Sequence, residues 1–298
     1  MKLNFFVILF FFVSLSLISC QKEVSFEVPD VTTSNAVNLL DSNYLSKVYA
    51  IDTSGSVNDT SYTIFYLYDN MRRHVKEIYH YSNVIPGDPD SAIAIYRYNS
   101  SDSLPYRTSG YYYVQANVYT EESYHYYNSS GQKVKDSITN SSNSEVHSYS
   151  YATNKIIGSS RLVDISSTQL FRDTAILDAT GNIIQLKESN NSNSSGTMQP
   201  FFKLTAVLDN KMNPLAKLSS FKAHPLFPAG NFPGEFIEFY PQKNNFLSCS
   251  YDLYNDVTGV YDFFELNQNQ ITYMPNGFIK TSRRLDVPEK KIYVYTTL

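Results

Sequence analysis

From Tyr44 onward, polar and apolar residues follow one recurring pattern: an aromatic-rich stretch, a polar turn that begins with Asp or Asn, and a second apolar stretch. Asp and Asn favour turns because their side chains bond to nearby backbone amides, and aromatic and β-branched residues favour strands. Each copy therefore predicts a β-hairpin. The clearest copies span residues 66–75, 124–134, 175–184 and 206–214.

The copies recur at a nearly constant interval. Their last residues before the turn are Tyr68, Tyr98, Tyr127, Tyr151, Leu177, Leu208, Tyr240 and Leu266. These residues lie 24 to 32 positions apart, which is typical of a repeat architecture, and consecutive hairpins give an antiparallel meander. Apolar side chains occupy both parities of residues 62–67, so we expect a sheet that is covered on both faces or curled on itself.

The pattern therefore predicts an all-β fold, an antiparallel meander of seven or eight repeated hairpins that forms a curled sheet or barrel-like roll. It predicts a single domain over residues 44–298. A Pro-rich loop is expected at residues 221–245, because four prolines fall there and Pro cannot donate to a sheet ladder.

Residues 1–19 are typical of a signal peptide, with Lys2 followed by an apolar run that is shorter than a membrane-spanning helix. The run ends in Leu17-Ile18-Ser19-Cys20, which resembles the bacterial lipobox. The resemblance implies cleavage before Cys20 and acylation of its thiol, and several acyl chains on one residue give stable anchoring. The alternative is a plain secretory signal that ends in Cys.

Residues 20–43 are expected to form a lipidated Cys and a flexible tether, since they are rich in Ser, Thr, Asn and Asp. The tether begins with Gln21-Lys22-Glu23, which partly resembles the surface-export signal of Bacteroidota lipoproteins. This resemblance implies an outer-membrane lipoprotein exposed at the cell surface. A lipoprotein on the periplasmic face of that membrane is the alternative.

The hairpins also resemble the tyrosine-aspartate (YD) repeats of Bacteroidota lipoproteins of unknown function. Residues 45–48 with 62–75, and residues 209–214 with 243–245, carry the resemblance most closely. The first turn departs from the pattern, because Met71 and Arg72 stand where Gly is expected. The resemblance implies a β-meander lipoprotein and assigns no catalytic residue.

Composition narrows the classes of partner. The net charge is -4 with only 17% charged residues, so clustered positive charge is lacking and a nucleic-acid partner is not expected. Hydrophobic residues make up 42% and aromatic residues 15%, enough to bury a core and to exclude global disorder. With Cys20 acylated, Cys249 has no intrachain disulfide partner, and its apolar strand-like setting predicts a buried, inert thiol.

No motif places a nucleophile beside a base, and neither a metal nor a cofactor is expected. The histidines are expected to be surface or packing residues, although His125 and His147 could meet on neighbouring strands. A cluster of oxygen-bearing side chains around Thr258-Gly259 predicts a solvated turn, with a Ca²⁺ site as the alternative. Its members are Asp252, Asn255, Asp256 and Asp262.

Two further features concern glycans. Tyr111–Tyr113 and Tyr124–Tyr127 could stack on sugars, but tyrosines in sheets more often pack across strands. Four sites fit the Asp-Ser/Thr motif at which Bacteroidota O-glycosylate extracytoplasmic proteins. Their acceptor residues are Ser91, Ser103, Ser137 and Thr174.

The sequence thus predicts a lipid-anchored cell-envelope protein with a binding or structural role and no enzymatic activity. Its expected partners are the membrane, through the N-terminal lipid, and a glycan or an envelope protein. The alternative is a surface glycan-handling protein, either a binding accessory or a hydrolase whose site no motif reveals.

Overall fold

The computed structural model describes residues 43–55, 59–82, 90–163, 168–191, 196–218, 220 and 242–298. All of the described residues belong to one compact unit, Leu39–Leu298. The predicted signal peptide, Cys20 and nearly all of the tether lie outside the described residues, as do residues 221–241 of the predicted Pro-rich loop. Among the described residues, no helix is long and apolar enough to cross a membrane.

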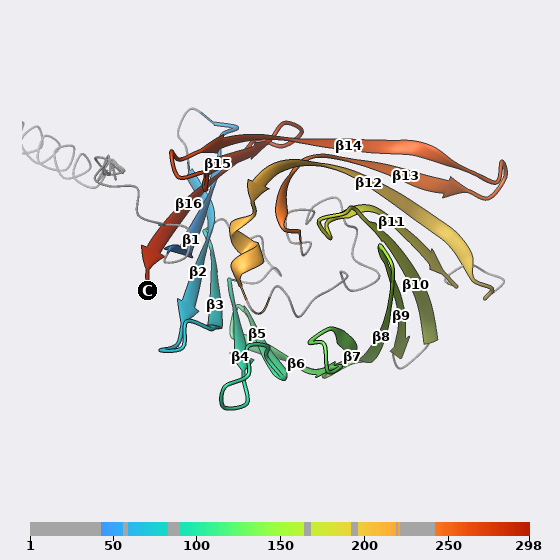
Figure 1. The fold of residues 1–298 in the computed structure, drawn as a ribbon, viewed down its shortest axis with the longest axis horizontal. Helices are drawn as coiled ribbons and strands as arrows, with labels where there is room; N and C mark the ends of the chain where they lie inside the picture. Colours follow the sequence, from blue (N-terminus) through green and yellow to red (C-terminus); the bar gives the residue numbers. More distant parts are fainter. Residues whose placement is uncertain are drawn as a thin grey trace, which may run out of the picture. The chain divides into compact units, whose positions relative to one another are not determined.

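The described residues form sixteen antiparallel strands, or eight hairpins, which follow one another in chain order around a closed barrel (Figure 1). The strands are β1 (Asn43–Asp52), β2 (Asp59–Tyr68), β3 (His74–Tyr81), β4 (Ser91–Arg97), β5 (Arg107–Val114), β6 (Asn117–Tyr127), β7 (Lys133–Asn140), β8 (Ser144–Ala152), β9 (Lys155–Val163), β10 (Thr168–Leu177), β11 (Ile183–Asn190), β12 (Gln199–Met212), β13 (Asn244–Asn255), β14 (Val260–Tyr273), β15 (Ile279–Arg284) and β16 (Glu289–Thr297). The predicted all-β antiparallel meander is confirmed. Pairing of β1 with β16 closes the barrel, with Val48 opposite Tyr293.

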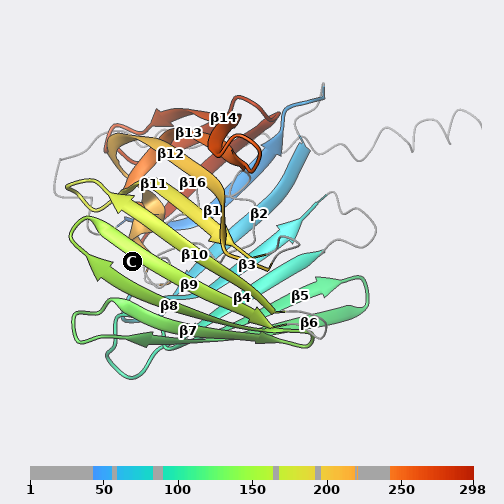
Figure 2. The same cartoon turned by 90° about the vertical axis from the view of Figure 1, so that its right-hand side faces the viewer.

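Figure 2 shows β7 to β11 side by side in the wall of the barrel, each paired with its neighbours in sequence. A short 3₁₀ helix, η2 (Pro214–Lys217), follows β12 and is capped by Asn213, whose side chain accepts a hydrogen bond from the Leu215 amide. Leu215 and Leu218 pack on Val48 of β1 and Ile64 of β2. Helix η2 lies inside the ring of strands (Figure 1), so the buried side of these strands is the inner wall.

The predicted turn chemistry is present at one end of the barrel. The carboxylate or amide oxygen Oδ1 of Asp69, Asn128 and Asp178 accepts hydrogen bonds from the backbone amides two and four residues further on, at 2.9–3.0 Å. These bonds fix a tight turn without help from the rest of the fold. The first, third and fifth of these turns therefore share one construction.

The first turn lacks the expected glycine but has the same backbone geometry as the others. Gly131 and Gly181 have φ angles of 75° and 87°, in the left-handed region that favours glycine. Arg72 occupies the corresponding position of the first turn and has a φ of 62°. The Asp69 side-chain bonds hold the turn in place, and the arginine accepts the left-handed conformation.

The tyrosine that precedes most of these turns has a specific role beyond strand propensity. Its hydroxyl donates to a backbone carbonyl near the start of the preceding strand, so that adjacent turns at this end of the barrel are linked. The pairs are Tyr68 with Leu45 at 2.7 Å, Tyr98 with His74 at 2.6 Å, Tyr127 with Pro105 at 2.8 Å and Tyr151 with Lys133 at 2.8 Å.

We expect Tyr127→Phe to lower the free energy of unfolding by about 1–2 kcal/mol, because it removes this bond and leaves the carbonyl of buried Pro105 without it. Tyr126→Phe is the matched control, since this neighbouring ring is exposed, and it should change stability by less than about 0.5 kcal/mol. Denaturant unfolding of the two variants measures the difference. Equal losses would show that the tyrosine hydroxyl does not link the turns.

The predicted repeat is wrong in the C-terminal part of the chain. Leu208 and Leu266 do not precede turns but lie inside β12 and β14, and Tyr240 lies outside the described residues. Strands β12 and β14 have 14 residues each. They are longer than the repeat predicts, so the expected turn positions fall inside them. Asp209 marks an irregularity in the β12–β13 pairing and accepts from the Asn245 amide at 3.0 Å.

Candidate functional site

The two walls of the barrel carry different side chains. Along the strands, buried residues alternate with accessible ones, as in β11, where Leu186 and Glu188 are buried and Lys187 between them is exposed. Most of the buried apolar side chains form two clusters. One includes Val48, Ile64 and Tyr66, and the other contains ten residues of β9 to β13.

The outer wall carries charged pairs that bridge neighbouring strands. Arg107 of β5 contacts Glu122 of β6 at 2.7 Å, and Lys203 of β12 contacts Asp252 of β13 at 2.5 Å. The carboxylates of both pairs lie on the outward parity of their strands, because Glu122 lies next to buried Ser123 and Asp252 lies next to buried Tyr251. The outer wall therefore carries inter-strand ion pairs beside exposed apolar side chains such as Leu67, Tyr124 and Val207.

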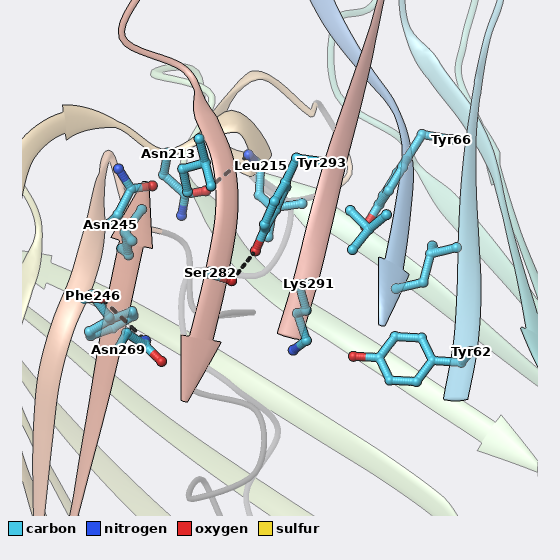
Figure 3. Close-up of a pocket in the computed structure, with 14 residues that line it drawn as sticks. Tyr62, Tyr66, Asn213, Leu215, Asn245, Phe246, Asn269, Ser282, Lys291 and Tyr293 are labelled. Atoms are coloured by element: carbon cyan, nitrogen blue, oxygen red, sulfur yellow. Dashed lines mark hydrogen bonds between the residues drawn. The ribbon is translucent and has the colours of Figure 1, made fainter. Parts of the chain in front are cut away.

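A pocket opens on the inner wall where the last strands meet the first two (Figure 3). Its lining comes from β1, β2, η2 and β13 to β16, and combines tyrosine rings, aliphatic side chains, amides and one lysine. The lining residues are Val48, Tyr62, Ile64, Tyr66, Asn213, Leu215, Asn245, Phe246, Asn269, Ile271, Ile279, Ser282, Lys291 and Tyr293. This mixture gives an apolar wall with a few fixed polar groups, as binding pockets do.

Lys291 is the cation of this pocket and is only 8% exposed. Burial lowers the pKa of its ammonium group to about 7, because the charged form loses its hydration. Its Nζ atom lies 3.5 Å from the carboxylate of Glu289 and 5.9 Å from the centre of the Tyr62 ring. Figure 3 shows Lys291 and the Tyr62 hydroxyl pointing toward one another. Because this pKa is about 7, the Lys291 side chain gains or loses its proton near neutral pH. Such a group suits recognition of an anionic or polar ligand group.

A second polar group crosses the inner wall on β6, β7 and β8. His125 is in register with Asp136, which is in register with His147. The two histidines therefore share a face as predicted, but the strand carrying Asp136 separates them. Burial lowers the pKa of His125 to about 3, helped by the charge of Lys133, so its imidazole is neutral at physiological pH.

Lys133 supplies the charge that faces Asp136. Its Nζ contacts the carboxylate of Asp136, and both side chains are almost completely buried, at 0% and 3% exposure. His125 lies 3.9 Å from the same carboxylate. Asp136 is thus held between a cation and a neutral imidazole on the inner wall.

Two carboxyl groups face each other further along the wall. Asp173 of β10 is in register with Glu188 of β11, and both are buried. Burial raises the pKa of Asp173 well above its ordinary value, and the charges of Glu188 and Glu145 raise it further. The Asp173 carboxyl is therefore protonated more readily than an exposed aspartate, and it can donate a hydrogen bond as well as accept one.

The cysteine and the acidic turn that the sequence singled out have structural roles. Cys249 is buried in β13, and burial raises the pKa of its thiol, in agreement with an inert group. Asn255 holds its own turn by accepting from the Val257 amide at 3.0 Å, and it donates to Asp262 at 2.7 Å. Within the described ranges, no three His, Cys, Asp or Glu side chains are grouped to hold a metal ion.

The other histidines divide between interior and surface. His74 is buried and lies 2.6 Å from the Ser220 hydroxyl, whereas His80 is exposed. His224 lies outside the described residues. Tyr124 and Tyr126 pack against cations across the outer wall, with Arg107 and Lys135 at 5.4 Å and 5.8 Å from the ring centres.

The four predicted O-glycosylation sites differ in access. Ser103 and Asp102 are exposed in the connection between β4 and β5, and Ser91 begins β4 after exposed Asp90. Ser137 and Thr174 lie within β7 and β10, and the aspartates before them are buried on the inner wall. Modification stays a prediction, and on a folded chain the geometry favours Ser103 and Ser91.

The sequence interpretation missed Lys133, Lys291 and the Asp173–Glu188 pair. A signal exists for Lys291, because it precedes Tyr293 and Tyr295 at the two-residue spacing of one strand face. A lysine on the tyrosine-bearing parity is expected to point inward. Asp173 lies two residues after Phe171, on the same face of the strand. This spacing distinguishes it from surface acids.

No family model matches the chain, and no curated protein sequence matches it. Among solved structures, it is similar to a porin-like protein from Bacteroides vulgatus ATCC 8482, with 10% identity and a TM-score of 0.45, covering 86% of this chain and 100% of that chain. It is also similar to a porin-like protein from Bacteroides uniformis ATCC 8492, with 12% identity and a TM-score of 0.47, covering 85% and 98%. At these TM-scores the similarity carries no argument about function.

Proposed function

We propose that this protein is a lipid-anchored outer-membrane protein whose barrel stands in water and binds its ligand through the inner wall, without catalysing a reaction. The observation that carries the proposal is the distribution of side chains between the two walls. The inner wall holds the tyrosine and aliphatic clusters and the pocket around Lys291. The outer wall holds inter-strand ion pairs.

A barrel that crosses a bilayer has the reverse arrangement, an outward apolar band about 25 Å tall around a polar interior. A lysine or arginine on the lipid face costs about 2–4 kcal/mol at the midplane. Arg107, Lys187 and Lys203 face outward, at positions on β5, β11 and β12. These positions support a water-facing barrel, for which the acyl chains on Cys20 would supply the membrane attachment.

The alternative is a glycan-handling role, which the buried carboxyl groups support. Carboxyl oxygens accept hydrogen bonds from several hydroxyl groups at once, and tyrosine rings stack on sugar faces. Asp173 and Glu188 lie close to the inner aromatic cluster of Phe202 and Tyr251. A polysaccharide panel with binding and product readouts separates this role from binding of other ligands.

The anchoring proposal is tested by separating the barrel from its lipid. Residues 1–19 are replaced with a cleavable secretory signal, and Cys20→Ser removes the acylated thiol. We expect this chain in the soluble periplasmic fraction, whereas the wild type incorporates labelled fatty acid and stays in the membrane fraction. Cys249→Ser is the control, and it should keep both the label and the membrane location.

A Cys20→Ser chain that still needs detergent for extraction would contradict the proposal, because the barrel itself would then be crossing the bilayer. Equal fatty-acid labelling with and without Cys20 would contradict the lipid anchor. Protease treatment of intact cells distinguishes surface exposure, which the Gln21-Lys22-Glu23 segment favours, from the periplasmic face.

A further inference from the structure

The pocket on the inner wall contains a buried hydrogen-bond acceptor that no described residue satisfies. Asn245 is 3% exposed and lines the pocket. Its Nδ2 atom donates to the Asp209 carboxylate at 3.0 Å and to the Lys211 carbonyl at 3.2 Å, so these acceptors fix the orientation of the amide. Its Oδ1 atom has no hydrogen-bond partner among the described residues, and Figure 3 shows it turned toward the other polar groups of the pocket. A buried acceptor without a donor costs free energy, which a donor on a ligand would restore.

A charged donor lies on the opposite side of the same pocket. Lys291 belongs to β16, three strands away from Asn245 on β13. Neighbouring strands lie about 4.8 Å apart, so the two residues are separated by about 14 Å along the wall. An ammonium group has three N–H donors, so a contact such as that with Glu289 at 3.5 Å does not exhaust them. The pocket therefore offers an acceptor at one side and a charged donor at the other.

Two hydroxyl groups lie between these two sides. Ser282 of β15 is in register with Lys291 of β16 and with Ile271 of β14. Its hydroxyl oxygen is 3.1 Å from that of Tyr293, and Figure 3 shows this pair between Asn245 and Lys291. Hydroxyl groups both donate and accept hydrogen bonds. The polar groups of the pocket thus form a row that can meet several hydroxyl groups of one ligand.

The rest of the lining favours an anionic ligand over a cationic one. Among the described residues that line the pocket, none is a carboxylate, and Glu289 contacts Lys291 from outside the lining. Val48, Ile64 and Leu215 belong to one apolar cluster and form a surface on which the carbon skeleton of a ligand can pack. A cationic ligand would meet the lysine without a counter-charge in the lining, whereas a carboxylate would pair with it.

We propose that this pocket binds a hydroxy acid of the sugar-acid class, with its carboxylate on Lys291 and its hydroxyl groups on Ser282 and Asn245. The inference rests on the proposed function, since it names the ligand of the inner wall. A single small anion reaches one side of the pocket only, and a neutral sugar brings no charge to the lysine. A hydroxy acid carries both kinds of group on one skeleton.

Three probes separate the contributions of the two groups. D-glucuronate carries a carboxylate and hydroxyl groups, D-glucose lacks the carboxylate, and cyclohexanecarboxylate lacks the hydroxyl groups. Calorimetric titration uses the full-length, detergent-solubilised protein at about pH 6, where Lys291 holds its proton. We expect glucuronate to bind at least about tenfold more tightly than either of the other probes. Equal affinities for the three probes, or no binding of glucuronate, would overturn the proposal.

Two variants place the ligand in the pocket. Lys291→Met should lower the affinity for glucuronate about tenfold or more, because methionine keeps the length of the lysine stem without its charge. Ser282→Ala should lower it about two- to tenfold and leave the affinity for cyclohexanecarboxylate unchanged. Lys290→Met is the matched control and should bind as the wild type does, because Lys290 is not buried and lies on the opposite parity of β16.

Circular dichroism checks that these variants keep the barrel. A glucuronate affinity that is unchanged in Lys291→Met would place the ligand elsewhere and refute the proposal. Binding of an amine or a neutral sugar in place of glucuronate, lost in Lys291→Met, would refute the hydroxy-acid ligand but keep a binding role for the inner wall. The anchor and the water-facing barrel are tested separately, by fractionation of the Cys20→Ser chain.

Discussion

Replacing Lys291 with Met is expected to stabilise the barrel strongly at about pH 6 and much less at about pH 9.5. Burial lowers the pKa of this lysine from 10.5 to about 7, so protonation of the folded protein is disfavoured relative to the unfolded chain. The cost is complete below about pH 7, where both states carry the proton. It fades as the pH rises toward 10.5, because the folded protein has already released the proton that the unfolded chain still holds.

This lowering of the Lys291 pKa reduces the free energy of unfolding by up to about 5 kcal/mol at low pH, at 1.36 kcal/mol for each unit of pKa. Met keeps the length and apolar contacts of the lysine stem without its charge. Denaturant unfolding at the two pH values measures the gain. Glu289, which lies 3.5 Å from Lys291, is present in both proteins and cannot mimic the slope by itself.

Lys290→Met is the matched control for this experiment. Lys290 is the preceding residue of β16, on the opposite parity, and its side chain is not buried. Its replacement should change stability by less than about 0.5 kcal/mol at either pH. A gain for Lys291→Met that does not depend on pH would show that the lysine keeps its ordinary pKa in the pocket.

Lys133→Met is expected to destabilise the protein by about 3–5 kcal/mol, because it leaves the Asp136 carboxylate buried without its cation. The pair has 0% and 3% side-chain exposure, so water cannot replace the lost charge. Burial lowers the pKa of Lys133 and the Asp136 carboxylate raises it, so the charged form of the lysine depends on its partner. Denaturant unfolding again provides the measurement.

Two further variants isolate the ion pair from loss of packing. Lys135→Met changes the exposed lysine two residues along β7 and should cost less than about 0.5 kcal/mol. In Lys133→Met/Asp136→Leu neither charge of the pair is left, so this double variant should be more stable than Lys133→Met alone. Equal losses for the two lysine variants, or additive losses in the double variant, would show that the buried pair is not the cause.

The local chemistry of the hairpins was readable from the sequence. The Asp and Asn turns form because their side chains reach amides only two and four residues away, as at Asp69 and Asn128. Strand propensity of the aromatic stretches acts over the same short range. The all-β antiparallel meander follows from these local features and is confirmed.

The repeat fails where strand length departs from the local period. Around Leu208 and Leu266 the residues fit the turn pattern, yet β14 stays paired with β13 through Leu266, and β12 resumes its pairing with β13 at Met212 after an irregularity at residues 209–211. Backbone pairing over a long strand outweighs the preference of one turn residue.

The sequence by itself determined most of the strands and the Asp and Asn turns, since each depends on neighbouring residues, and the anchor at Cys20 stays a prediction. Only the tertiary structure decided that β1 pairs with β16, and therefore which parity of every strand became the interior. Closure sums small strand twists and register shifts over sixteen strands, and no local segment contains that sum. It also placed Lys133, Asp173 and Lys291 on the inner wall, where burial, a property of the whole barrel, changes their pKa values.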